Sequence, residues 1–299
     1  MLIGRHKGGP VWLNNFAGAS FFTTWQAPAS TPGATQVTNG TQLEAAIAAA
    51  SPGDTIELTS VGAYTLTASP LWNTAGAALN IVALVEGAYI EGAHNITCSG
   101  TGRVLNITGV WFKNTSHYQV YAQYSTINLY RCRFWCTDFN GWSVYCYRPA
   151  NVLAEGCIWD ELPDVGQAAI YCTDSGTANA IVRNCTIDGL IGPSDGLAGY
   201  GGATIEVHNT AVRPGAAKEA MYTAVVDSGD YNAATDATMP GANTHDNITW
   251  SNYYDASYIP QNANAKTGGD TSNRATWDYY GNVLADFPSA PIGAIYAGE

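Results

Sequence analysis

A short pattern returns along most of this chain, and it restricts the fold more than any other feature of the sequence. Each copy is centred on one anchor residue, and successive anchors are 22, 22, 25, 28, 25 and 43 residues apart. Repeats of ~20 to 50 residues are typical of solenoid proteins, in which each copy forms one turn and stacks on the next. The anchors are Ala88, Val110, Cys132, Cys157, Cys185, Thr210 and Tyr253.

The residues around each anchor predict two short strands. Apolar side chains stand five and three positions before the anchor, as at Leu105 and Ile107, and a mostly apolar residue stands two positions after it, as at Phe112. Only Asp255, after the last anchor, departs from the second rule. Alternation with period two is the pattern of a half-buried strand, so we expect every other side chain to face a core.

The residue immediately before the anchor predicts a sharp corner between these strands. It is Gly or Asn in six of the seven copies, and these residues adopt the left-handed backbone conformation most readily. We expect Arg131, the exception, to occupy a tolerant or slightly altered turn. The corner residues are Gly87, Gly109, Arg131, Gly156, Asn184, Asn209 and Asn252.

This corner column resembles the short Asn-bearing corner of the pectate-lyase-like superfamily of right-handed parallel β-helices. The resemblance covers residues 35–255 and includes 41–44, which look like a capping box that opens a short helix with Leu43, Ile47 and Ala50 on one face. It implies an all-β fold, namely a single-stranded right-handed parallel β-helix of about seven rungs with a short N-terminal capping helix. In general style the chain is also similar to phage virion β-helix proteins.

Three segments differ from the repeats. Residues 1–34 carry aromatic side chains among Gly, Ala and Pro, and we expect an arm that packs on the solenoid or anchors it to a neighbour. Residues 213–246 lengthen the last spacing and are predicted to be an insertion, and residues 256–299 are predicted to form a C-terminal cap. No apolar window reaches the ~18 residues of a membrane span, and residues 1–10 do not open a Sec-type signal. We therefore expect a virion protein, or alternatively an extracellular one.

The charge balance excludes two classes of partner. The chain has 12 Lys and Arg against 24 Asp and Glu, a formal net charge of -12. Such a chain has no basic stripe to neutralise phosphates, so nucleic acid and anionic membranes are poor partners.

The seven cysteines are predicted to line the interior. Cys132, Cys157 and Cys185 occupy the anchor column, and Cys146 and Cys172 share a second column. We expect free buried thiols, with disulfides between rungs as the first alternative and a metal site as the second, because no CxxC or Cys/His ligand spacing is present.

Acidic residues provide the candidates for catalysis. Asp160 and Asp188 each stand three positions after an anchor and are expected to be vertical neighbours, with Asp174 as a further candidate. Paired carboxylates can act as general acid and base or hold Ca²⁺ against a uronate, so a calcium cofactor is expected only if the protein is a lyase. The alternative is that they are solvated carboxylates at strand ends. The motifs of polygalacturonase-like and pectate-lyase-like enzymes are absent.

Aromatic residues provide the candidates for binding. Tyr121, Trp135, Trp142 and Tyr147 fall in adjacent repeats, where strand alternation should expose some of their rings. Exposed rings contact sugars or protein partners, although Tyr and Trp are also common strand formers that simply cover a sheet.

Three functions from different classes are compatible with these features. The first is a structural or adhesive component of a phage virion, such as a head decoration protein, spike or tail fibre, whose partners are virion proteins or copies of itself, for example in a homotrimer. The second is a polysaccharide lyase or glycoside hydrolase acting on an extracellular glycan. The third is a bacterial surface adhesin. We favour the first.

Overall fold

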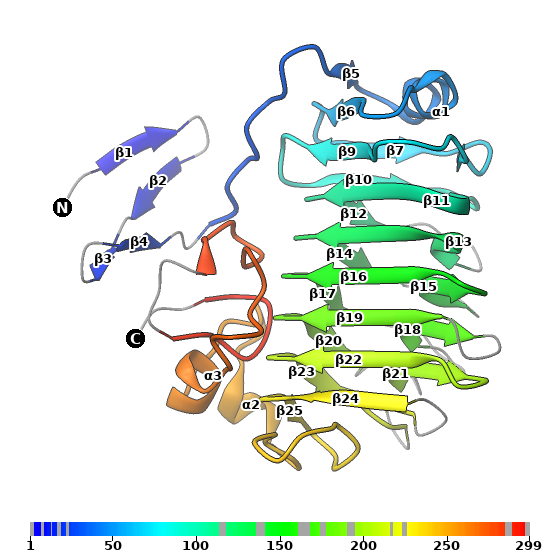
Figure 1. The fold of residues 1–299 in the computed structure, drawn as a ribbon. Helices are drawn as coiled ribbons and strands as arrows, with labels where there is room; N and C mark the ends of the chain where they lie inside the picture. The colour runs from blue at the N-terminus through cyan, green and yellow to red at the C-terminus, as the bar shows by residue number, and fades with distance from the viewer. Residues whose placement is uncertain are drawn as a thin grey trace.

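The chain folds into an all-β parallel β-solenoid of about seven turns, as the repeat predicts (Figure 1). The computed structural model describes all residues except 1–2, 7–8, 13, 17–18, 22–23, 114–117, 136–140, 161–167, 174–177, 190–194, 216–217, 223–225, 285–288 and 297–299. In residues 1–23 and 226–227 it describes the backbone only.

One face of the solenoid is an eight-stranded parallel sheet. Its strands are short and follow the corner column, so that each turn of the chain contributes one of them. In sheet order they are β25 (Ala233–Ala234), β23 (Ala211–Arg213), β20 (Thr186–Asp188), β17 (Ile158–Asp160), β14 (Arg133–Trp135), β12 (Trp111–Phe112), β10 (Ala88–Glu91) and β7 (Gly62–Thr65).

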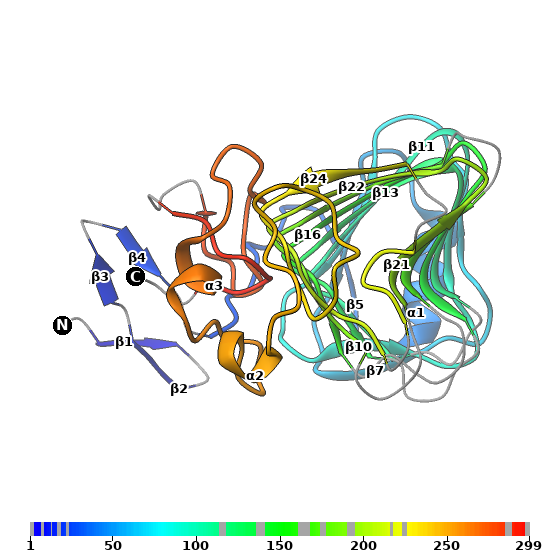
Figure 2. The same cartoon turned by 90° about the horizontal axis from the view of Figure 1, so that it is seen from below.

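The other two faces belong to a thirteen-stranded sheet that bends around the core (Figure 2). The long strands β11 (Ile96–Thr108) and β13 (Tyr118–Tyr130) run through both faces. The face before the corner contains β5 (Thr35–Val37), β6 (Thr55–Leu58), β9 (Leu79–Ala83), β16 (Asn151–Glu155), β19 (Asn179–Arg183), β22 (Thr204–His208) and β24 (Val226–Asp230). The third face contains β8 (Leu71–Trp72), β15 (Trp142–Tyr147), β18 (Ala168–Thr173) and β21 (Asp195–Tyr200).

The N-terminal range that we expected to be an arm contains two antiparallel strand pairs. Strands β1 (Ile3–His6) and β2 (Gly9–Trp12) form the first, and β3 (Asn14–Phe16) and β4 (Ala19–Phe21) form the second.

The predicted corners are left-handed in all but the last copy. The φ angle is +81° at Gly87, +71° at Gly109 and +61° at Gly156, and it is +47° at Asn184 and +53° at Asn209. Arg131 also adopts the left-handed region, with φ +57°, so its turn is the same as that of its neighbours. A second set of left-handed corners, at Tyr124 and Arg148, was not predicted because neither residue type favours that conformation.

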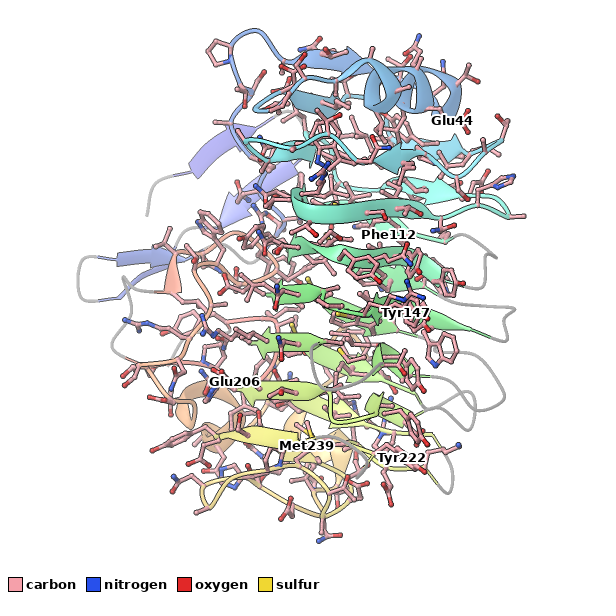
Figure 3. All side chains as sticks on the ribbon, turned by 45° about the vertical axis from the view of Figure 1, so that its right-hand side comes forward. Glu44, Phe112, Tyr147, Glu206, Tyr222 and Met239 are labelled. Carbon is pink, nitrogen blue, oxygen red and sulfur yellow. The ribbon has the colours of Figure 1, made fainter. Side chains whose placement is uncertain are left out.

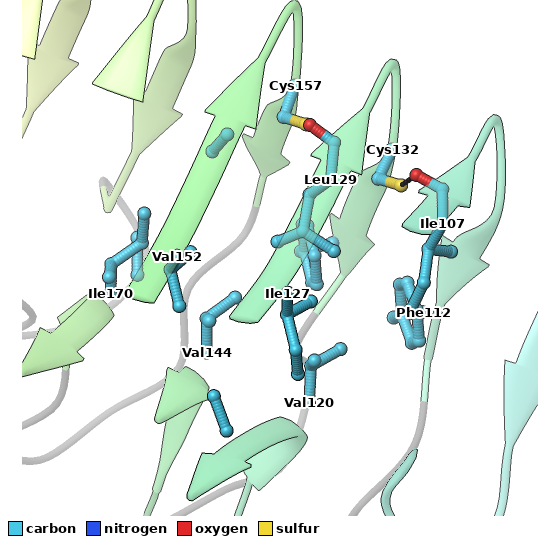
Figure 4. Close-up of a cluster of buried hydrophobic side chains, with 14 of the residues drawn as sticks. Ile107, Phe112, Val120, Ile127, Leu129, Cys132, Val144, Val152, Cys157 and Ile170 are labelled. Carbon is cyan, nitrogen blue, oxygen red and sulfur yellow. Dashed lines mark hydrogen bonds between the residues drawn. The ribbon is translucent and has the colours of Figure 1, made fainter. Parts of the chain in front are cut away.

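The anchor column and the apolar positions around it form the core (Figure 4). Phe112, Phe134 and Trp159 stack across three turns, with ring centroids 4.9 Å and 4.7 Å apart. The thiols of Cys132 and Cys157 donate hydrogen bonds to the carbonyl oxygens of Ile107 and Leu129, at 3.4 and 3.5 Å. The six cysteines that the structure describes are free and buried, as predicted.

A short helix covers the N-terminal end of the solenoid, as expected. Helix α1 (Gly40–Ala49) buries Leu43 and Ile47 against the first turns. The predicted capping box was shifted by two residues, because the N-cap is Asn39, whose side chain accepts a hydrogen bond from the backbone of Gln42 at 2.9 Å. The side chain of Gln42 accepts one in return from the backbone of Thr38, at 2.8 Å.

The last turn was misplaced by the sequence pattern. Asn252 and Tyr253 lie in helix α2 (Trp250–Tyr253) and form no corner. The true last corner is Tyr231, with φ +59°, and residues 213–246 contain strands β24 and β25, which pair with β22 and β23. This turn was hidden because the apolar positions before the anchor are occupied by Asp and Gly in 226–230 and the anchor itself is Asn.

The C-terminal end is closed by residues 235–249. The side chain of Met239 reaches the main core, and Figure 3 shows it at the last turn. Asp236 accepts a hydrogen bond from the backbone of Ala220 at 2.9 Å, and the hydroxyl of Thr238 accepts one from the backbone of Met221 at 3.0 Å. These bonds occupy backbone groups that an open end would leave unpaired.

The C-terminal segment, residues 250–296, lies along the side of the solenoid over the corner column in its described parts, 250–284 and 289–296 (Figure 1). We expected a cap at the end instead. The segment begins with α2 and continues through α3 (Ala263–Thr267). Asn209 binds both backbone groups of Asp270, donating to its carbonyl at 2.8 Å and accepting from its N–H at 2.6 Å. Asn184 makes an equivalent pair of bonds to Pro291 and Ala275, both at 2.7 Å.

Arg131 links the same corner column to both ends of the chain. Its guanidinium donates to the carbonyl of Gln26 at 2.6 Å and to that of Tyr279 at 3.2 Å, and it lies over the ring of Trp25 at 5.2 Å. Burial lowers the pKa of this guanidinium. An arginine replaces Gly or Asn at this corner because its side chain holds two covering segments together.

The Asn209 tether can be tested without disturbing the corner. We expect Asn209→Gly, which keeps the left-handed conformation and removes two bonds from a fully buried side chain, to lower the free energy of unfolding by about 1–3 kcal/mol. Urea unfolding and proteolysis of residues 250–284 measure the effect. Asn73→Gly is the matched control, because that side chain is exposed and makes no hydrogen bond among the described residues. Equal effects of the two changes would contradict a tether.

The buried thiols should be inert in the folded protein. Burial raises the pKa of Cys132 and Cys157 well above its usual value, so both remain protonated at neutral pH and lack the reactive thiolate. We expect iodoacetamide to leave the six described cysteines unmodified until urea unfolds the chain, as read by mass spectrometry of peptides. A peptide pair joined by a disulfide, or labelling before unfolding, would contradict the free-thiol structure.

Candidate functional site

The two aspartates proposed as catalytic candidates are neighbours, but each is held in an ion pair. Strands β17 and β20 pair in register up to Trp159 and Ile187, so Asp160 and Asp188 follow one above the other. Arg133 donates to Asp160 from Nε at 2.8 Å, and Arg213 donates to Asp188 from Nε at 2.8 Å. In both pairs a second guanidinium nitrogen also contacts the carboxylate.

The C-terminal segment lies close to these ion pairs. Asp160 and Asp188 are only 4% and 5% exposed, and the hydroxyl of Tyr258 donates to Asp188 at 3.2 Å. Burial and the adjacent carboxylates raise the pKa of Tyr258. The expectation of solvated carboxylates at strand ends was therefore wrong for these two residues. Asp174, the third candidate, lies outside the described residues.

The four aromatic candidates do not lie together. Trp135 ends β14 on the eight-stranded face, where the ammonium of Lys113 lies 3.8 Å from the centre of its ring. Tyr121, Trp142 and Tyr147 lie instead on the third face, in β13 and β15. They belong to one surface there.

This surface is a strip of outward-facing side chains in two columns, which we call the tyrosine strip. The parallel register places one residue of each column in each turn, because β8, β11, β13, β15, β18 and β21 stack without offset. The first column is Leu71, Thr97, Tyr121, Tyr145, Tyr171 and Ala198, and Tyr222 continues it through the Leu197 to Met221 bridge. The second is Ser99, Gln123, Tyr147, Thr173 and Tyr200. Trp142, which stacks on Tyr145 and Tyr171 beside the first column, completes the strip.

The rings of the strip stack on one another. Tyr145 is the centre of the stack, with ring centroids 5.4 Å from Tyr121, 5.8 Å from Tyr171 and 4.9 Å from Trp142. Trp142 also stacks on Tyr171, at 4.5 Å. The planes lie within 28° of parallel in these pairs. Since ring faces contact each other within the stack, the rings present mainly edges and hydroxyls to the outside.

An arginine lies at one edge of the strip. Arg148 occupies a left-handed corner, with φ +61°, and its guanidinium is 4.9 Å from the ring centre of Tyr147. It donates to the hydroxyl of Tyr124, at 2.7 Å, and Tyr124 is itself a left-handed corner. Two bulky residues in a strained conformation are unusual, and such strain is concentrated at functional positions.

The two columns of the strip hold no charged side chain, and partial burial keeps two of their tyrosine hydroxyls neutral. Burial and the neighbouring tyrosines raise the pKa of Tyr121 to about 12, and they also raise the pKa of Tyr145. Both hydroxyls therefore keep their protons at any physiological pH. Figure 3 shows Tyr147 and Tyr222 along the same side of the solenoid.

A charged cluster on the face before the corner was not found by sequence reasoning. Arg183 lies 3.5 Å from Glu155 and 3.8 Å from Glu206, and Glu206 lies 3.1 Å from the Nε2 atom of His208. The backbone of Thr276, in the C-terminal segment, donates to Glu155 at 3.3 Å. Glu155, Arg183 and His208 are opposite one another in successive strands, and Glu206 reaches Arg183 diagonally from two positions before His208, so the cluster is a set of cross-strand ion pairs.

Comparison with known proteins found no family model and no curated protein that matches the chain. Within the described ranges, no group of three or more His, Cys, Asp and Glu side chains is placed to hold a metal ion. No helix in the described part of the chain is both long and apolar enough to cross a membrane.

Because the candidate aspartates form ion pairs, we expect their substitution to destabilise the protein. We expect Asp160→Asn to lower the free energy of unfolding by about 1–3 kcal/mol, less than the ~3–5 kcal/mol of a fully buried pair because the side chain of Arg133 is 29% exposed. Urea unfolding measures it, and Asp246→Asn, at an exposed carboxylate, is the control. An Asp160→Asn variant as stable as the native protein would contradict the structural role.

Proposed function

We propose that this protein is a structural or adhesive β-helix that acts by contact through its tyrosine strip. The observation that carries the proposal is the strip itself, a regular array of stacked rings on a face where Tyr200 and Tyr222 remain 66% and 47% exposed. Contiguous exposed aromatic surface marks interaction sites in soluble proteins. A stack built across parallel strands is also rigid, so little conformational entropy is lost when a partner binds.

The setting that we propose is a phage virion, in a head decoration protein, spike or tail fibre of the pectate-lyase-like kind. A continuous hydrogen-bonded solenoid with closed ends supports this use, because it unfolds slowly and presents long faces. Partners in such a particle would be other virion proteins or further copies of the chain. A bacterial surface adhesin would use the same strip. The binding experiment below therefore tests the strip for a virion protein and for an adhesin alike.

The surroundings of the candidate aspartates argue against a polysaccharide lyase or glycoside hydrolase. Asp160 and Asp188 are committed to ion pairs near Tyr258, whereas a catalytic carboxylate must reach the substrate. Incubation with alginate, pectin and capsular glycans, with and without Ca²⁺, tests the activity directly. Unsaturated products or new reducing ends would overturn the proposal of a purely adhesive protein.

Removal of strip rings should weaken adhesion. We expect Trp142→Ala and Tyr145→Ala to reduce binding of the purified chain to bacterial cells and to immobilised surface polysaccharides by at least about tenfold, because truncating an aromatic anchor costs more than ~1 kcal/mol. Tyr89→Ala is the control, because Tyr89 lies in β10 on the eight-stranded face. Thermal unfolding of each variant separates lost contact from lost structure. Binding at the native level by both strip variants would contradict the assignment of the strip as the adhesive surface.

A further inference from the structure

We propose that the tyrosine strip binds an uncharged, unbranched polysaccharide whose chain lies along the axis of the solenoid. This inference rests on the proposed function and adds the chemical class and the direction of the ligand. It is carried by three properties of the strip: its lack of charge, the hydroxyls that its stacked rings leave outside, and its repetition from turn to turn.

The lack of charge is local, because the protein as a whole is strongly acidic. The formal net charge is -12, yet no Asp, Glu, Lys or Arg occupies any position of the two columns, which span five stacked strands from β11 to β21. Arg148 lies at the edge of the strip against the ring of Tyr147, but neither column itself holds a basic residue, so an anionic glycan would approach an acidic protein with one adjacent guanidinium to offset the repulsion along the columns. A neutral glycan meets no such repulsion.

The stacked rings determine which atoms a ligand can reach. The hydroxyls of Tyr121, Tyr145 and Tyr171 have no hydrogen-bond partner among the described residues, and the ring faces are largely covered by one another. Each such hydroxyl can donate and accept, as can a sugar hydroxyl. Thr97 extends this column, and Ser99, Gln123 and Thr173 add polar side chains in the second column, where Ser99 donates to Gln123 at 3.3 Å.

The repetition selects a ligand that is itself repetitive. Consecutive turns of a parallel sheet are ~4.8 Å apart, so the strip presents similar groups at a constant short interval along the axis. A linear polysaccharide offers hydroxyls at regular intervals along its length. The centre of a protein–protein interface is usually apolar, with hydrogen bonds at irregular positions, and a column of Thr, Tyr and Gln side chains fits that description less well.

The test removes the hydroxyls and keeps the rings. The triple variant Tyr121→Phe, Tyr145→Phe and Tyr171→Phe preserves the aromatic stack, and Tyr89→Phe on the eight-stranded face is the matched control. The probes are neutral dextran, mannan and galactan and anionic polygalacturonate, alginate and hyaluronate, measured by affinity electrophoresis and titration calorimetry. Neutral oligosaccharides of increasing length report the direction, because a ligand that lies along the axis gains affinity as it crosses successive turns.

We expect at least one neutral polysaccharide to bind, affinity to rise with oligosaccharide length, and the triple variant to lose at least tenfold in affinity with an unchanged Tm. Binding of anionic glycans alone, no gain with length, or native affinity in the triple variant would each overturn the inference. Adhesion to cells that falls in Tyr145→Ala but not in the triple variant would also overturn it and leave the adhesive function standing. If neither variant changes adhesion, the proposed function fails as well.

Discussion

The left-handed corner before each anchor residue is the constraint on which the rest of the structure depends. It turns the chain at the same point in every turn, so strands on both sides of it stack in parallel register and inward positions fall into columns. The anchors from Ala88 to Thr210 are all completely buried, which shows how closely the columns follow from the corner. Cysteine suits this column because its thiol can donate to a carbonyl of the preceding turn while the side chain stays small.

The residue type at each corner also determines how the C-terminal segment packs on the outside of the solenoid. Glycine at position 156 lets the C-terminal segment approach closely, since a Cβ atom there would lie 2.7 Å from the carbonyl oxygen of Trp277. Asn184 and Asn209 accept the same backbone conformation and add an amide that binds that segment at two points. The corner column therefore has two roles. It turns the chain in each repeat, and it binds the C-terminal segment. Burial of Asp160 and Asp188 near Tyr258 accompanies this docking.

The sequence pattern around each anchor predicts the repeat well, because a corner and its flanking strands are encoded within a few residues. The solenoid, its N-terminal helix and the buried cysteine columns were predictable for that reason. The last turn was not, because Asp, Gly and Asn replace the apolar residues of the pattern in 226–232. The environment of Asp188 could not be predicted from the local pattern either, since its partner Tyr258 is 70 residues away in sequence. Trp135 was grouped with Trp142 because they are close in sequence, although different faces carry them.

The tyrosine strip shows how a solenoid can organise a binding surface without a loop-built pocket. An isolated exposed tyrosine rotates freely and loses that freedom when it binds. In the strip, Tyr145 is held between Tyr121 and Tyr171 of the adjacent turns, and Trp142 contacts two of the strip's tyrosines at once. The parallel register thus fixes the direction of several hydroxyls before any ligand arrives, and the raised pKa of Tyr121, about 12, keeps that hydroxyl neutral. Preorganisation of this kind lowers the entropic cost of binding, and it follows from the same corners that build the core.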